Sequence, residues 1–97
     1  GALEAFRELH RRDPRNELVR FKIVLCQLSL GQEDEARKMA DTLIPAGSTP
    51  AWYYARAALA RKAGDQRAAA RNLQAAQAIY EAANCKLFDE SMGVLKF

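Results

Sequence analysis

Few residues in this chain have the types and spacing that catalysis requires. His10 is the only histidine, and it lies beside Arg11 and Arg12 with no acid or nucleophile at a fixed spacing. A general base needs a positioned partner within hydrogen-bond reach. The serines lack the sequence context of a nucleophile elbow, and the glycines are isolated, so no phosphate-binding loop is indicated. We therefore expect no catalytic residue and no enzymatic activity.

The acidic residues and the cysteines predict neither a metal site nor a cofactor site. Asp89 and Glu90 form a lone acidic pair, which is typical of a solvated helix turn. Cys26 and Cys85 belong to no close Cys/His cluster, and a cysteine on an apolar helix is usually a small buried side chain. A disulfide between them stays open, because it needs the two Cα atoms within about 7 Å. We expect no metal and no cofactor.

The remaining cluster that could bind a ligand is basic. The net charge of +3 lies entirely in residues 49–97, which hold Arg56, Arg61, Lys62, Arg67 and Arg71 close to the aromatic run Trp52-Tyr53-Tyr54. Clustered bases can contact nucleic-acid phosphates. A solubilising arginine face opposite an alanine-rich core is the commoner origin of such a pattern. We keep nucleic-acid binding as a third interpretation and do not expect it.

Helical segments must position these residues. Apolar residues recur at spacings of three and four, and the few Gly and Pro residues lie between the periodic stretches. Asp13-Pro14 stops the first helix, Gly31 and Gly64 end the second and fourth, and Thr49-Pro50 starts the fourth. The predicted helices cover residues 2–12, 16–30, 33–44, 50–63 and 66–83.

The tail predicts a further short helix. Phe88, Met92 and Leu95 lie at offsets of four and seven, so residues 86–97 are amphipathic, and we expect Gly93 to end the helix and leave the last residues extended. These apolar side chains should cap the outer side of helix 66–83, which has no following unit to cover it. The division we expect within one domain of residues 1–97 is 2–14, 16–45, 49–84 and 85–97.

A set of residues returns about every thirty-three positions. Ala36, Ala40 and Leu43 repeat the spacing of Ala69, Leu73 and Ala76, and an earlier set at Ala2, Phe6 and Leu9 follows the same rule. Gly31 and Gly64 precede the second and third sets by five residues each. A period of this size marks a stacked array of helical repeats, in which each unit buries its apolar face against a neighbour.

The pattern resembles the tetratricopeptide repeat. The residues that carry the resemblance are Gly31, Ala36 and Leu43 in one unit, Trp52, Gly64, Ala69, Leu73 and Ala76 in the next, and Ala2, Phe6, Leu9 and Asp13-Pro14 in a partial first unit. Arg56 departs from it, because the family prefers a large apolar side chain there. The resemblance implies an all-α fold of antiparallel helix-turn-helix repeats, stacked as a short right-handed superhelical array with a C-terminal capping helix.

The resemblance also implies a concave groove lined by the first helix of each unit. The residues expected to contact a partner are Leu18, Phe21, Leu25, Tyr54 and Arg61, with Phe21 and Tyr54 as anchors. The family members that grip a carboxylate use Lys, Arg and Asn in such a groove. The groove here is apolar and partly aromatic, so we exclude a carboxylate clamp.

We therefore expect a non-catalytic scaffold that binds a protein or peptide in this groove. The alternative is a structural or oligomerisation segment, whose apolar surfaces pack against the parent chain or a second copy. Exposed groove aromatics would favour the first interpretation, and a filled groove the second. The partner itself cannot be read from the sequence.

Residues 2–12 should need a cover that this chain does not supply. Leu3, Phe6 and Leu9 form the stripe that packs on the first helix of the same unit, so we interpret the chain as a fragment of a larger repeat protein. Preceding residues or a second copy would cover the stripe, and the fragment could self-associate through residues 2–12. No stretch is long and apolar enough to cross a membrane, and we favour a cytoplasmic location, although a leader could have been removed upstream.

Overall fold

The fold is a stack of α-helices. The computed structural model describes residues 1–45 and 47–94, and this part of the chain contains helices and no strand. The helices are α1 (Ala2–Arg12), α2 (Glu17–Ser29), α3 (Glu33–Ala40), α4 (Ala51–Lys62), α5 (Gln66–Ile79) and α6 (Ala82–Val94). The predicted all-α class is confirmed.

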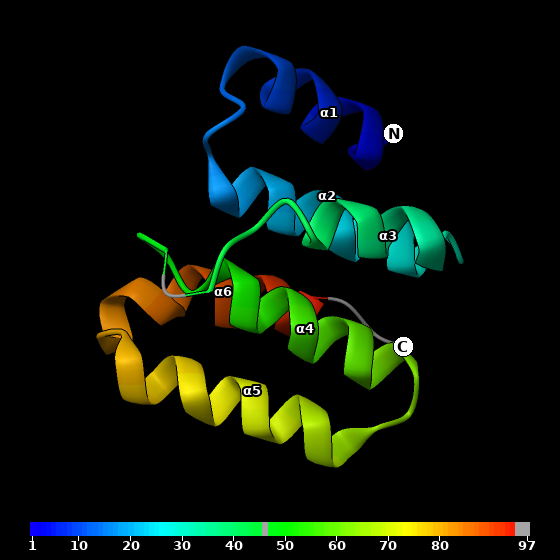
Figure 1. Ribbon diagram of the computed structural model, residues 1–97. Helices are drawn as coiled ribbons and strands as arrows, with labels where there is room; N and C mark the ends of the chain where they lie inside the picture. The colour runs from blue at the N-terminus through cyan, green and yellow to red at the C-terminus, as the bar shows by residue number, and fades with distance from the viewer. Residues whose placement is uncertain (46, 95–97) are drawn as a thin grey trace.

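The helices pack as successive neighbours. α2 packs against α3 and α4 against α5, while α2 and α4 lie side by side and join the two pairs. α1 rests on α2 at one end of the stack, and α5 lies at the other end (Figure 1). α6 follows α5 and returns along the stack to reach α2 and α4.

The turns within the two pairs have the same construction. Gly31 and Gly64 have positive φ angles of 77° and 82°, a backbone region that strains other residues. The residue after each glycine donates its N–H to the carbonyl oxygen five positions earlier, Gln32 to Gln27 at 2.8 Å and Asp65 to Ala60 at 2.9 Å. These bonds satisfy the open carbonyl groups at the helix end. The identical closure explains why the two glycines recur at the same place in each unit.

Small residues lie where helices cross closely. Ala36 and Ala69 are 0% and 1% exposed, as the repeat predicted. A methyl side chain lets two helix backbones approach, so a larger residue at either position would push the pair apart. The buried core continues through apolar residues of α2 and through Leu43, which follows α3.

The third helix is shorter than predicted. It ends at Ala40 instead of residue 44. The Thr42 hydroxyl donates to the Met39 carbonyl, and Arg20 Nη1 donates to the Thr42 carbonyl at 2.8 Å. The backbone changes there to bonds that reach three residues back, from the Thr42 N–H to the Met39 carbonyl at 3.0 Å and from the Leu43 N–H to the Ala40 carbonyl at 3.1 Å. The side-chain bonds accompany this change at the end of the helix.

The end of α5 also differs from the prediction of a helix to residue 83. α5 stops at Ile79, Tyr80 is extended with φ −109° and ψ 149°, and α6 already begins at Ala82. Gly93 lies inside α6 and does not end it, and Leu95 is outside the described residues. The expected cap is therefore an independent helix that starts earlier and runs longer.

Candidate functional site

The predicted groove is a shared face of α2 and α4, which we call the α2/α4 groove. Phe21 and Tyr54 meet there, with ring centroids 6.1 Å apart and planes inclined by 77°. Leu25 on α2 and Ala58 on α4 lie on the same buried face. Edge-to-face aromatic pairs are favourable at this spacing. The structure thus brings together the two residues that the sequence singled out as anchors.

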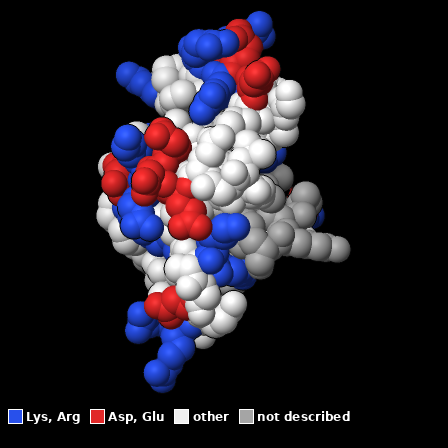
Figure 2. Space-filling view, turned by 90° about the vertical axis from the view of Figure 1, so that its right-hand side faces the viewer, with Lys and Arg blue, Asp and Glu red and all other residues white. Residues whose placement is uncertain are grey.

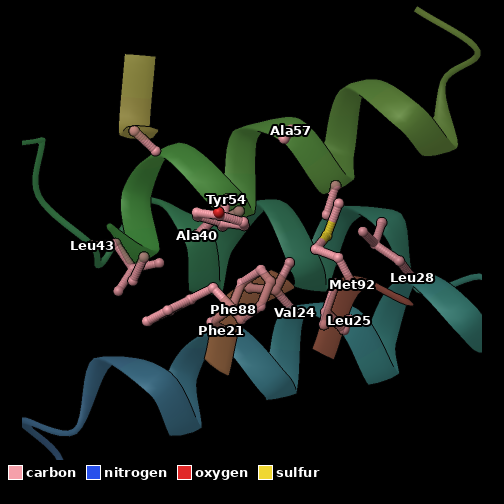
Figure 3. Packing of buried hydrophobic residues seen from close by; sticks show 14 of the residues in the cluster. Phe21, Val24, Leu25, Leu28, Ala40, Leu43, Tyr54, Ala57, Phe88 and Met92 are labelled. Carbon is pink, nitrogen blue, oxygen red and sulfur yellow. The ribbon is translucent and has the colours of Figure 1, made fainter. Parts of the chain in front are cut away.

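Helix α6 fills this groove. The Phe88 ring lies 5.2 Å from the Phe21 ring and 5.4 Å from the Tyr54 ring, centroid to centroid. Cys85 and Met92 lie on the same side of α6, and these three residues are 2–6% exposed. Figure 3 shows the Phe88 and Phe21 side chains together below Tyr54, with Met92 toward Leu25 and Leu28. Phe21 and Tyr54 are consequently 0% exposed.

A polar bond also joins α6 to the groove. The Tyr54 hydroxyl donates to Asp89 Oδ1 at 2.5 Å. Burial raises the pKa of Tyr54 well above its ordinary value of 10, and the bond to the Asp89 carboxylate raises it further. Both effects favour the protonated hydroxyl, which is the form that can donate this bond. Asp89 and Glu90 are both exposed on α6, and Asp89 in addition accepts this bond from the groove.

The other predicted partner residues lie around the covered anchors. Leu25 is buried at 2% exposure, whereas Leu18 and Arg61 are half-buried. Leu18 packs against the core from the first turn of α2, and Arg61 lies in the last turn of α4. Leu18 and Arg61 are thus the predicted residues that solvent still reaches.

Sequence reasoning missed that Phe88, Asp89 and Met92 belong to this site. The spacing of Phe88 and Met92 identified a buried face of the tail, but not the surface that it meets. The predicted cap does contact α5, but it also contacts α2 and α4, which the prediction did not include. The local pattern of a helix does not encode which of several apolar faces it packs on.

The order of the helices and the glycine-closed turns point to one repeat family. A family model described as tetratricopeptide repeat matches residues 1–59. The chain belongs to the tetratricopeptide-repeat family. Searches of curated proteins and of solved structures gave no match. Tetratricopeptide repeats generally mediate protein–protein interactions as non-catalytic scaffolds.

The repeat departs from its family at Arg56, and the structure shows what replaces the usual apolar contact. The Arg56 guanidinium donates to Asp41 Oδ1 at 2.7 Å and lies 5.3 Å from the Trp52 ring centre. The long aliphatic stem and the stacked guanidinium fill space beside the aromatic ring. Arg56 therefore links α4 to the end of α3, between two repeat units.

The aromatic run of the second repeat points in three directions, as helical geometry requires. Tyr54 is buried in the groove, while Trp52 and Tyr53 are half-buried. Tyr53 contacts Tyr80 at 6.3 Å between ring centres. The run is thus used for packing between helices.

Opposite charges are interspersed on the side of the molecule seen in Figure 2. Arg56 is already engaged by Asp41, and Arg67 and Arg71 lie exposed on α5. The side of the molecule seen in Figure 2 carries no continuous basic stripe of the kind that would favour nucleic-acid binding. Within residues 1–45 and 47–94, no group of three or more His, Cys, Asp or Glu residues is placed to hold a metal ion.

Helix α1 leaves a second apolar surface. No residue of α1 is fully buried, and Leu9 is 45% exposed. A cleft of about 580 Å³ lies between the start of α1 and the end of α2, and its lining includes Leu3, Cys26 and Leu30. Both cysteines are free, so the disulfide that the sequence left open is not formed.

Among the described helices, none is long and apolar enough to span a bilayer.

Proposed function

We propose that this chain is a non-catalytic protein-interaction module that receives a helical segment of a partner in the α2/α4 groove. The proposal is supported by membership of the tetratricopeptide-repeat family, whose repeats generally mediate protein–protein interactions. The choice of the groove is supported by the position of α6, whose side chains already pack there. Phe88 lies within ring-contact range of both Phe21 and Tyr54. Burial of an amphipathic helix in an apolar groove is a common mode of peptide recognition.

In this proposal the contact residues are the five that the sequence indicated. Phe21, Leu25 and Tyr54 form the floor that anchors the partner's apolar side chains. Leu18 and Arg61 lie at the borders of that floor and meet the partner first, because they are half-buried and not covered. A partner must take the place of α6 to reach the anchors.

One observation favours the alternative function. The groove is filled by the chain's own helix, as expected of a structural segment whose apolar surfaces serve intramolecular packing. A segment of this kind would hold its parent protein together and would recognise no other protein.

Site-specific photo-crosslinking in the source cells distinguishes the two functions. A photoreactive amino acid replaces Leu18 or Arg61 in the natural protein, and Arg67 on the exposed side of α5 serves as the control position. We expect the groove positions, and not residue 67, to crosslink to a different protein. Crosslinks confined to the same chain or to a second copy at both groove positions would reject the interaction function and support the structural one.

A further inference from the structure

The corner between α5 and α6 differs from the other corners that join successive repeats. The segment between α1 and α2 contains Pro14, and the segment between α3 and α4 contains Pro45 and Pro50, residues that the interior of a helix excludes. The corner Ile79-Tyr80-Glu81-Ala82 contains neither Pro nor Gly, and no such residue occurs from Gln66 to Met92. Residues of ordinary or high helix propensity thus run through the bend. The local sequence accordingly does not require the chain to bend here.

Tertiary contacts hold the bend instead. The Tyr80 hydroxyl donates to the Gly47 carbonyl at 2.8 Å, and its ring lies against Tyr53. On the far side of the corner, Cys85, Phe88 and Met92 are held in the groove. The bend interrupts backbone bonding, because the last carbonyl groups of α5 and the first N–H groups of α6 lose the partners that a continuous helix would supply. The bent form is therefore held by the contacts of Tyr80 and by the docking of α6.

We propose that α6 is a displaceable occupant of the α2/α4 groove, and that the corner at Tyr80 straightens to join α5 and α6 into one helix when a partner helix enters. The inference rests on the proposed function and specifies its regulation. In the closed form α6 competes with the partner. In the open form the backbone groups at the corner bond to each other and the groove aromatics are free.

The seat of α6 also defines the chemistry of the partner. Cys85, Phe88 and Met92 occupy the groove at spacings of three and four, and Asp89 receives the Tyr54 hydroxyl. A competing helix must supply the same set of contacts. The partner is therefore an amphipathic helix with a small residue, an aromatic residue and a flexible apolar residue at these spacings, and with an acid directly after the aromatic.

Two substitutions shift the equilibrium in opposite directions. Ala82→Pro preserves the closed form, because residue 82 is exposed and opens α6, where proline is favoured. Glu81, which would precede the proline, lies outside both helices, and a residue before proline prefers a non-helical backbone. The same proline would break a continuous helix, since it lacks the N–H that bonds to the Ala78 carbonyl. Phe88→Ala instead weakens the closed form by removing the central groove contact.

The probe is a synthetic, fluorescently labelled peptide of residues 82–94, titrated against the wild-type chain and the two variants. A tethered helix acts at an effective concentration of about millimolar, so the free peptide should bind the wild type weakly. We expect Phe88→Ala to tighten binding at least about tenfold and Ala82→Pro to weaken it below the wild type. A control peptide carrying Phe88→Ala should bind no variant, and one carrying Asp89→Asn should bind less tightly than the parent peptide.

The outcomes separate the inference from the function on which it rests. Equal peptide affinity for all three chains would overturn the displaceable α6 while leaving the groove as a helix-binding site. No binding to a folded Phe88→Ala chain would overturn the groove function itself. If Phe88→Ala does not fold, as judged by circular dichroism, Met92→Ala replaces it, because this change removes a contact nearer the end of α6.

Amide hydrogen exchange tests the same opening without any peptide. In the wild-type chain, amides of α6 and of the Tyr80 corner should exchange faster than those of α4, because opening does not require unfolding of the repeats. Ala82→Pro should slow exchange within α6. Exchange of α6 at the rate of α4, unaffected by Ala82→Pro, would overturn the inference.

Discussion

Tyr54 acts in the closed groove through both its ring and its hydroxyl group. The ring contacts the rings of Phe21 and Phe88, and the hydroxyl donates to Asp89, 35 positions further along the chain. Because the residue is 0% exposed, loss of the hydroxyl leaves the ring contacts in place and removes one bond to a charged acceptor. Replacing Tyr54 by Phe therefore measures the contribution of the hydrogen bond to α6 separately from that of the ring contacts.

Tyr54→Phe should lower the free energy of unfolding by about 1.5–3 kcal/mol at neutral pH, the range for a hydrogen bond to a charged group. Urea unfolding monitored by circular dichroism measures the change. Asp89→Asn keeps an acceptor and should cost less. Equal stability of wild type and Tyr54→Phe would show that the hydroxyl gains nothing by donating to Asp89 instead of water.

The same tyrosine predicts a pH dependence. Burial raises the pKa of Tyr54 and of Tyr80 above the ordinary value of 10. In the unfolded chain these hydroxyls ionise near pH 10, whereas in the fold they keep their protons. The stability they contribute is complete below about pH 10 and decreases as the pH rises above it. Tyr54→Phe should therefore reduce the loss of stability between pH 9 and 11, and an unchanged slope would contradict the assignment.

At the scale of helices and turns, the glycines of the repeats differ from the glycine of α6. Gly31 and Gly64 need positive φ angles, whereas Gly93 lies in α6, and a Cβ atom at any of the three would meet nothing within 4 Å. Gly31→Ala and Gly64→Ala should each lower stability by about 1–2 kcal/mol through backbone strain alone. Gly93→Ala is the matched control.

Gly93→Ala should leave stability unchanged or raise it by up to about 1 kcal/mol, because alanine favours the helix. Differential scanning calorimetry of the three variants checks the contrast. A loss at Gly93 as large as that at Gly31 would mean that the strain argument does not explain why glycine stands in both turns.

The sequence predicted the repeats well because their signals are local. Gly31, Gly64, Pro14 and the buried alanines act within one or two turns of their own helix, so periodicity and capping rules locate them. The end of α3 was misplaced because Arg20, 22 residues before Thr42, captures the Thr42 carbonyl. The bend at Tyr80 was not predicted because it also depends on a distant contact, the bond from the Tyr80 hydroxyl to the Gly47 carbonyl.

The candidate site was predictable in part. The repeat register placed Phe21 and Tyr54 on one face, and their rings do meet. The occupant of that face was not predictable, because the apolar stripe of α6 would also suit the outer side of α5. A choice between two apolar surfaces depends on the shapes of both, as with Phe88 between two rings.

For the molecule as a whole, the apolar stripe of α1 predicts self-association. Leu9 is 45% exposed, and Leu3 and Phe6 are half-buried. Leu9→Glu places a charge on this stripe and should shift a concentration-dependent dimer toward monomer in analytical ultracentrifugation. Leu87→Glu is the control, because Leu87 on α6 is also an exposed leucine, at 55%. A dimer weakened by Leu87→Glu alone would place the contact on α6.

The reach of α6 across the stack has a consequence for the cooperativity of unfolding. In a repeat array, each unit touches only its neighbours, so units can melt one after another. Here one helix contacts α2, α4 and α5 together, and it therefore couples the two repeat pairs. Wild type should melt in one transition whose van't Hoff and calorimetric enthalpies agree. Phe88→Ala should lower the van't Hoff value below the calorimetric one, and agreement in the variant would mean that the direct contact of α2 with α4 suffices to couple the units.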